Sequence, residues 1–161
     1  MGSMEPVDLT AAAEMWKAYQ SAHPDLATDN EMPSVERFGD HPALSDELLG
    51  LVIDGEKRAT ATLLKEFEAE GQQLPRIGSH WIACDGAGRP RAILRSTELR
   101  IGTIDTADAA FAYDEAEDDR SLDAWLLGHR TYWNRICPSL GIEWSDDLEI
   151  LFERFTVAWT A

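Results

Sequence analysis

Apolar residues recur every three to four positions in several stretches of this chain, and this spacing predicts amphipathic helices. In the first stretch, Leu9, Ala12, Trp16 and Tyr19 fall on one stripe. The last stretch follows Ser121, a residue type that commonly caps a helix N-terminus. Helices are predicted over residues 9–22, 45–54, 59–70, 106–115 and 121–136, with Ser45 as the cap of the second.

Other segments alternate apolar and polar residues, which is the period of a half-buried strand. Such strands are predicted over His80–Cys84, Arg91–Ile101 and Ile150–Trp159, with a hairpin turn at residues 85–88. Residues 23–43 hold three prolines and predict an irregular connection. Because helices and mostly antiparallel strands mix without a β-α-β rhythm, the expected class is α+β.

The net charge is −16, from 30 acidic and 14 basic residues among 161. Such a charge opposes non-specific binding to a long polyphosphate, because binding to nucleic acid rests largely on basic side chains. We therefore expect a small substrate or a local basic patch, and no DNA partner. The length favours a single domain with a sizeable core.

Cys84 and Cys137 are the only cysteines, so the chain has no disulfide framework and fits a reducing cytoplasm. We interpret both as buried structural thiols. The four histidines show no metal-ligand spacing, so no metal site and no cofactor are expected. No apolar run approaches the roughly 20 residues that cross a bilayer, and no secretory signal is present.

The run Gly55-Glu56-Lys57-Arg58-Ala59-Thr60 is the strongest candidate for chemistry. If it formed a helical turn, the Lys57 ammonium and the Thr60 hydroxyl would share one face. A desolvated lysine can lose its proton and a threonine can act as a nucleophile. A solvated lysine beside a helix-capping threonine explains the same spacing.

Several segments in order resemble one family. They are Gly55-x-Lys57-x-Ala59-Thr60, Leu74-Pro75-x-x-Gly78, Asp85-Gly86-x-Gly88-x-Pro90, the acidic stretch 115–122, Trp125-x-x-x-His129 and Glu153-Arg154-Phe155. Together they resemble the ASCH (activating signal cointegrator homology) domain family, in its longer bacterial form with an extra N-terminal helix. The resemblance covers about residues 35–159.

This resemblance implies a PUA-like mixed β-barrel with surrounding helices. It divides the chain into an expected expression remnant (1–4), an N-terminal helical extension (5–34) and the ASCH domain (35–161), the last two packed as one unit. Family members are linked to RNA, as binding modules or small enzymes. Hydrolysis of the acyl amide on the exocyclic nitrogen of acylated cytidine is one activity that the resemblance implies, and RNA cleavage is another.

The family's hydrolase pattern falls here on Lys57, Thr60 and Glu115. Longer members usually read Glu-Gly-Glu-Gly-Asp where this chain reads Glu115-Ala116-Glu117-Asp118-Asp119. Losing both glycines can change the loop, because glycine reaches positive φ cheaply. Glu117 or Asp118 therefore remains an alternative to Glu115 in the cleft.

In the expected mechanism Thr60 attacks the amide carbonyl, Lys57 accepts the threonine proton, and Glu115 passes a proton to the leaving nitrogen or positions a water. Backbone N–H groups near Thr60, at a helix start, hold the oxyanion. The expected substrate-binding residues are Arg58, Thr62, Arg95, Glu117, Asp118, His129 and Arg130.

Some of these residues have a plainer interpretation. Arg95 either contacts a nucleobase or forms an ion pair with Glu153, and His129 fits a hydrogen-bonded core histidine better than a ligand. The leading hypothesis is an amidohydrolase of acylated cytidine that acts on a nucleoside or on RNA. The alternatives are a non-catalytic RNA-binding module and a ribonuclease.

Overall fold

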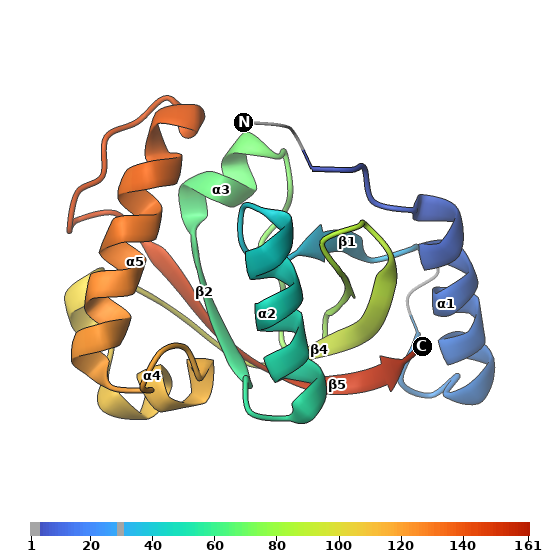
Figure 1. The fold of residues 1–161 in the computed structure, drawn as a ribbon. Coiled ribbons are helices and arrows are strands. Elements are labelled where there is room, and N and C mark those ends of the chain that lie inside the picture. Colours follow the sequence, from blue (N-terminus) through green and yellow to red (C-terminus); the bar gives the residue numbers. More distant parts are fainter. Residues whose placement is uncertain (1–3, 29–30) are drawn as a thin grey trace. The chain divides into compact units, whose positions relative to one another are not determined.

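The computed structural model describes residues 4–28 and 31–161, and the chain adopts an α+β fold with a five-stranded mixed sheet (Figure 1). Residues 1–3 of the expected remnant lie outside the described residues. The helices are α1 (Leu9–Ala22), α2 (Pro42–Asp54), α3 (Leu64–Ala69), η1 (Ile104–Thr106), α4 (Ala109–Glu115), α5 (Leu122–Ile136) and η2 (Cys137–Leu140). The strands are β1 (Ser34–Arg37), β2 (Ala59–Leu63), β3 (His80–Cys84), β4 (Pro90–Gly102) and β5 (Ile150–Thr160).

The strands are hydrogen-bonded in the order β1-β3-β4-β5-β2. The pair β1–β3 is parallel, whereas β3–β4 and β2–β5 are antiparallel. The chain divides into two compact units. Unit 1 comprises residues up to Gly55 with 78–95 and 156–161, and unit 2 comprises residues 56–77 and 96–155.

The most periodic segments fold as predicted. Helix α1 has the predicted bounds, and the side chain of Asp8 accepts a hydrogen bond from Ala11 N at its start. Gly55 ends α2 with φ 87°, a left-handed conformation that favours glycine. Ser121 caps α5, because its hydroxyl accepts from Ala124 N. The α+β class is confirmed.

Three local predictions are wrong. Residues 59–63 form strand β2, and only 64–69 are helical, because β2 pairs with β5 along its length. The cap of α2 is His41, whose Nδ1 accepts from Leu44 N, while the Ser45 hydroxyl donates to Phe38 O inside the fold. The connection over residues 23–43 contains strand β1, which the sheet partner β3 stabilises.

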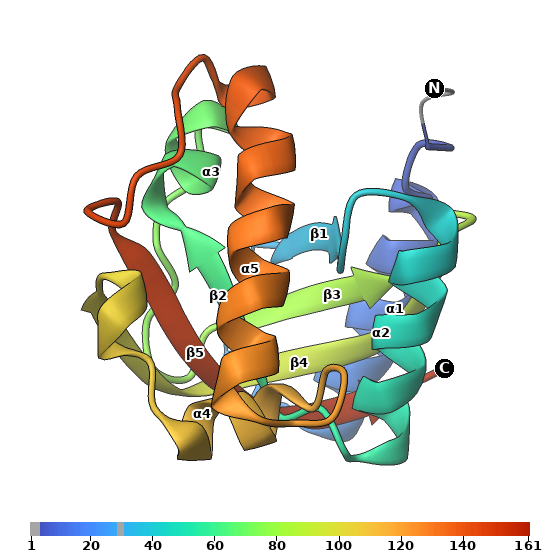
Figure 2. The ribbon, with the colours of Figure 1, turned by 60° about the vertical axis from the view of Figure 1, so that its left-hand side comes forward.

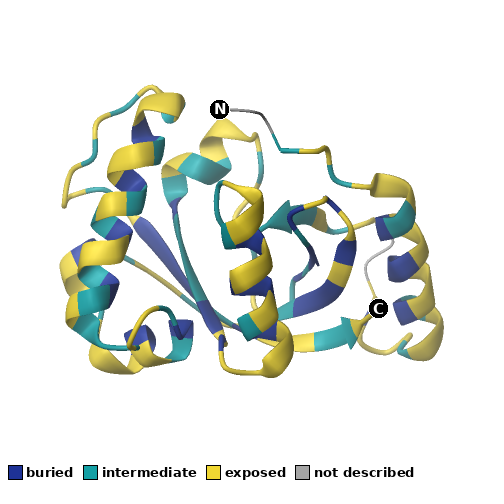
Figure 3. Ribbon diagram, viewed as in Figure 1, coloured by how far each residue is buried: buried dark blue, intermediate teal, exposed yellow. Residues whose placement is uncertain are grey.

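The core of unit 2 lies where α4 and α5 pack against β2 and β5 (Figures 2 and 3). Trp125 and Trp133 of α5 are buried in one cluster with Ala59 and Leu63 of β2 and with Phe152 of β5. Alternate residues of β2 face this cluster, so Thr60 and Thr62 lie on the opposite face of the strand. The cluster fixes α5, and with it one side of the site described below.

Unit 1 has its own core, in which Trp16 and Tyr19 of α1 pack with Ile82 and Ile93 of the sheet. The Tyr19 hydroxyl lies 2.9 Å from His80 Nε2. Across the described part of the chain, no helix combines the length and apolar character that spanning a membrane needs.

Candidate functional site

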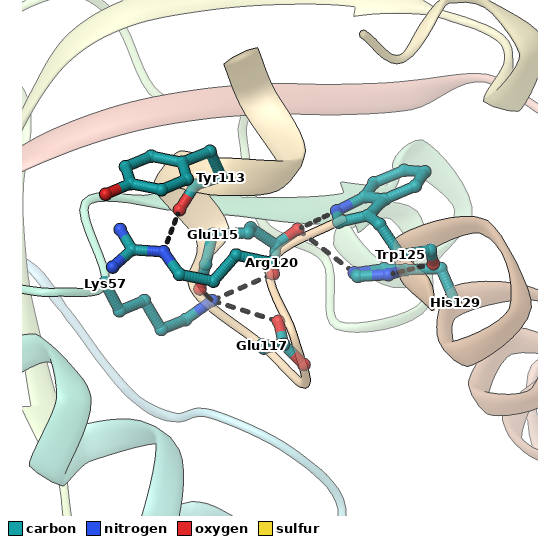
Figure 4. Close-up of polar contacts among 7 residues, drawn as sticks. All are labelled: Lys57, Tyr113, Glu115, Glu117, Arg120, Trp125 and His129. Carbon is teal, nitrogen blue, oxygen red and sulfur yellow. Dashed lines mark hydrogen bonds and ion pairs between the residues drawn. The ribbon is translucent and has the colours of Figure 1, made fainter. Parts of the chain in front are cut away.

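Lys57 is buried within unit 2 and bound by acidic groups (Figure 4). Only 1% of its side chain is exposed, which excludes a solvated lysine. Its ammonium donates hydrogen bonds to Glu115 Oε2 at 2.8 Å, to Glu117 Oε2 at 3.1 Å and to the backbone oxygen of Glu115 at 3.2 Å. A buried ammonium is stable only with such partners. Lys57, Glu115 and Glu117 therefore form one ion cluster, called the Lys57 cluster below.

Glu115, the last residue of α4, connects Lys57 to α5. Its Oε2 accepts from Lys57, and its Oε1 accepts from Trp125 Nε1 at 3.0 Å. His129 Nε2 also lies 3.0 Å from Oε1. Three donors therefore surround a carboxylate that is 2% exposed. Such a carboxylate is strongly held in its charged form.

His129 stacks on Trp125, one helical turn before it, with ring centroids 4.0 Å apart and an interplanar angle of 20°. Its Nδ1 lies 2.9 Å from the backbone oxygen of Trp125, which can only accept. Its Nε2 faces the Glu115 carboxylate. Because both ring nitrogens face acceptors, the doubly protonated imidazolium fits these contacts. The structure thus bears out a hydrogen-bonded, buried His129.

The pKa values follow from this packing. Burial opposes the charge of Lys57, but Glu115 and Glu117 outweigh it and raise the Lys57 pKa. Burial likewise opposes the Glu115 charge, yet Lys57 and His129 hold the pKa of that carboxyl well below its usual range. The His129 pKa is raised because Glu115 outweighs burial. Lys57 is therefore an ammonium, contrary to the expected lowering of its pKa.

Glu117 behaves differently from Glu115. Burial, and then the neighbouring charge of Glu115, raise the pKa of Glu117 to about 7. Its side chain is 26% exposed, so solvent reaches it. Glu117 is thus the carboxyl of this cluster that can exchange a proton near neutral pH.

The loop after α4 places Glu117 through an unusual backbone. Ala116, Asp118 and Arg120 have φ values of 62°, 53° and 67°, in the left-handed region. Two of these residues, Ala116 and Asp118, stand where the family resemblance implies glycine. The loop therefore keeps a glycine-type conformation without glycine, at a cost of roughly 1–2 kcal/mol per residue. Asp118 is exposed, whereas Glu115 and Glu117 both reach Lys57.

Oxygen and nitrogen atoms of Glu115, Glu117 and His129 lie within 4.8 Å of one another, close enough to surround a metal ion. Lys57 already provides the positive charge between the two carboxylates. A divalent ion would have to displace this ammonium, so the donor set as folded fits a lysine better than a metal.

Thr60 lies on strand β2 and not on a helical turn. Its register partner is Glu153, which is 5% exposed and accepts a hydrogen bond from the Ser96 hydroxyl at 2.8 Å. Thr60 is half-buried, as is Thr62. The predicted helix N-terminus near Thr60, with its oxyanion-binding amides, is therefore wrong, and so is the alternative of Thr60 as a helix cap.

The predicted arginines lie in different places. Arg58 is exposed and pairs with Asp114 at 2.9 Å, and Arg130 pairs with Asp146 at 3.2 Å. Arg95 is half-buried on β4 in unit 1, with His80 as its register partner, whereas Glu153 belongs to unit 2. None of these contacts involves the Lys57 cluster.

Three contributors to this region were not predicted as site residues. Trp125 was predicted only as a helix-face residue, although its spacing to His129 was noted. Arg120 places its guanidinium 3.7 Å from the centre of the Tyr113 ring. No sequence signal distinguished Tyr113 and Arg120, because their contact depends on how the loop between them folds.

Comparisons with known proteins show a family match and similar solved structures. The ASCH domain family model matches residues 34–158. The crystal structure of a protein from Enterococcus faecalis V583 is similar at 28% identity and a TM-score of 0.83, covering 93% of this chain and 89% of that one. The ASCH domain from Lactobacillus crispatus JV V101 is similar at 25% identity and a TM-score of 0.82, covering 94% and 96%. A search of curated proteins gives no match.

Proposed function

This chain belongs to the ASCH domain family, which is PUA-like and associated with RNA, and from this premise we propose that it hydrolyses the acyl amide of acylated cytidine. The observation that carries the proposal is the contact between Lys57 and Glu117, 3.1 Å long. It couples a fixed cation to a carboxyl whose pKa is about 7. Amide hydrolysis needs both a group that stabilises the oxyanion and a group that moves a proton.

The contacts support different roles from those expected. Lys57 is held as an ammonium, so it does not serve as the base. Its three N–H groups are donated within the protein, and the one that binds Glu117 is released for the developing oxyanion when Glu117 takes up a proton. Glu115 is held by three donors, so it fixes Lys57 in place and does not carry a proton. Glu117 takes the part of the proton carrier.

Glu117 removes a proton from the nucleophile while the nucleophile's oxygen bonds to the amide carbon. The carbon–nitrogen bond then breaks, and the proton on Glu117 passes to the leaving nitrogen, which gives cytidine. The nucleophile is a water molecule or the Thr60 hydroxyl. With Thr60 an ester forms on the enzyme, and a water molecule hydrolyses it in a second step.

A small nucleoside is the substrate that the charge of −16 favours over long RNA. We would follow the conversion of N4-acetylated cytidine to cytidine by chromatography. The test compares the wild type with Lys57→Met, Glu117→Gln and Thr60→Ala. Lys65→Met is the matched control, since Lys65 pairs with Glu68 on an exposed helix face.

We expect turnover by the wild type and by Lys65→Met, and loss of about 100-fold or more in Lys57→Met and Glu117→Gln. Activity in the wild type should rise as the pH passes about 7, because Glu117 must be ionised to accept a proton. Thr60→Ala distinguishes the two possible nucleophiles. The variant stays active if a water molecule is the nucleophile, and it loses activity if the Thr60 hydroxyl is. Wild-type turnover that survives in Lys57→Met would refute the proposed role of Lys57.

A non-catalytic RNA-binding module is the second candidate. Its non-catalytic part is favoured by one observation: Lys57 donates to three protein acceptors and is 1% exposed, as in a static ion cluster. In that case RNA binding should weaken steeply with salt, by a slope that scales with the number of phosphates bound. Absence of acetylcytidine turnover together with such a slope would favour this candidate.

A further inference from the structure

Tyr113 and Arg120 form a stacked pair beside the Lys57 cluster, and Figure 4 includes both. The guanidinium carbon of Arg120 lies 3.7 Å from the centroid of the Tyr113 ring. Arg120 Nε donates to the backbone oxygen of Tyr113 at 2.9 Å, and Nη2 donates to that of Glu56 at 3.3 Å. The guanidinium is therefore fixed over one face of the ring.

The pair adjoins the candidate site along the chain at three points. Tyr113 precedes Glu115 by two residues, and Arg120 ends the loop that carries Glu117. Arg120 also binds the carbonyl of the residue before Lys57. Its own backbone has φ 67°, so the loop holds it in a strained conformation. Strain of this kind persists where the surroundings enforce it and concentrates at functional sites.

The aromatic ring of Tyr113 is not needed to hold the loop in its fold. The residue is 53% exposed, although it carries a large aromatic group. The hydrogen bonds that fix the loop end on backbone oxygens, so any residue at 113 would supply that acceptor. Arg120 covers one face of the ring, which leaves the other face and the edge for a ligand. The fold thus presents a flat aromatic surface whose orientation is fixed.

We propose that the open face of Tyr113 is the platform on which the base of the ligand stacks, with Arg120 holding the ring in place. The inference rests on the proposed function for the position of the site and for the nucleoside class, but not on catalysis. Aromatic side chains bind nucleobases by stacking, and a fixed ring loses little entropy on binding. Tyr113 is then a binding residue for any planar base.

The test measures cytidine binding by isothermal titration calorimetry, with ribose as the probe without a base. Cytidine is the product of the proposed reaction, so binding is measured without turnover. The variants are Tyr113→Ala, which removes the ring, and Tyr113→Phe, which keeps it. Leu127→Ala is the control, because Leu127 on α5 is also a large exposed side chain, at 71% exposed, and has no aromatic ring.

Tyr113→Ala should weaken cytidine binding by about 5- to 150-fold, the range for loss of one stacking contact. Tyr113→Phe and Leu127→Ala should bind as the wild type does. Ribose should bind equally weakly to all four proteins, which a general disruption of the site would not produce. Equal cytidine affinity of Tyr113→Ala and the wild type, or no cytidine binding by the wild type, would overturn the platform.

The two proposals can fail separately. Cytidine binding that depends on the Tyr113 ring, without hydrolysis of acetylcytidine, would refute the amidohydrolase and keep the platform. Hydrolysis with a KM that is unchanged in Tyr113→Ala would refute the platform and keep the amidohydrolase. A kcat that falls at unchanged KM would assign Tyr113 to the chemistry and would also overturn a role in base binding.

Discussion

Lys57 binds two different groups of Glu115. Its ammonium lies 2.8 Å from the side-chain oxygen Oε2 and 3.2 Å from the backbone oxygen of the same residue. Glu115 ends α4, where the last carbonyls have no partner within the helix. Lys57 thus balances a buried carboxylate and also caps a helix C-terminus, where a positive charge is favourable.

This double contact makes Lys57 important for stability, apart from the part in the chemistry that we propose for it. Lys57→Met leaves Glu115 and Glu117 buried without their cation, so we expect the free energy of unfolding to fall by about 3–5 kcal/mol. Urea unfolding followed by circular dichroism measures the change. Lys65→Met, which breaks the exposed pair with Glu68, should cost less than about 1 kcal/mol. Equal losses in the two variants would contradict the buried ion cluster.

Glu117 should make stability depend on pH. Its pKa is about 7 in the folded chain and near 4.5 when unfolded, so the folded state binds the proton more tightly. Its contribution to stability is complete below about pH 4.5 and is lost as the pH rises through about 7. The wild type should therefore lose stability relative to Glu117→Gln over this window.

A second buried glutamate, Glu66, affects stability over the same pH range. Burial also raises the pKa of Glu66, on α3, to about 7, and the same sign applies to it. Glu66 is present in both proteins, so the difference between the wild type and Glu117→Gln isolates Glu117. Urea unfolding at steps from pH 4.5 to 8 gives that difference. A difference that stays constant across the series would show that the Glu117 pKa is not raised.

His129 should titrate above the usual range of histidine. Glu115 raises its pKa against the effect of burial, so we expect Glu115→Gln to lower the pKa. Imidazole proton shifts in NMR spectra recorded over a pH series report the His129 pKa in both proteins. The contribution of His129 to stability is present below about pH 6.5 and is lost as the pH rises through the higher pKa that His129 has in the folded chain. An unchanged His129 titration in Glu115→Gln would contradict the contact.

Sequence periodicity predicted the elements whose local pattern and packing agree. Helix α1 has a capping Asp8 and one apolar stripe, and α5 has Ser121 at its start, so local and tertiary preferences coincide. Strand β2 was mistaken for a helix because Leu63, Leu64 and Phe67 have helical spacing. Its threonines favour a strand, and pairing with β5 decided between the two.

The sequence predicted which residues form the candidate site, but not their protonation states or contacts. The family resemblance indicated Lys57, Glu115 and the region of Glu117. The charge on Lys57 depends on burial and on two carboxylates 58 and 60 residues away in the chain, which no local pattern contains. The pair of Tyr113 and Arg120 depends likewise on the loop backbone, whose positive φ values Ala116 and Asp118 do not predict.

The loop after α4 is strained at Ala116. Ala116 has φ 62°, where a Cβ atom is crowded and glycine is not. Ala116→Gly should raise the free energy of unfolding by about 0.5–1 kcal/mol, because relief of strain exceeds the entropy that glycine adds to the unfolded chain. The matched control is Ala110→Gly, at an exposed position of helix α4, which should lower it by up to about 1 kcal/mol. Thermal and urea unfolding measure both. Loss of stability in both variants would show that the loop is not strained at Ala116, whereas opposite signs would establish that this chain retains a glycine-type loop at the expense of stability.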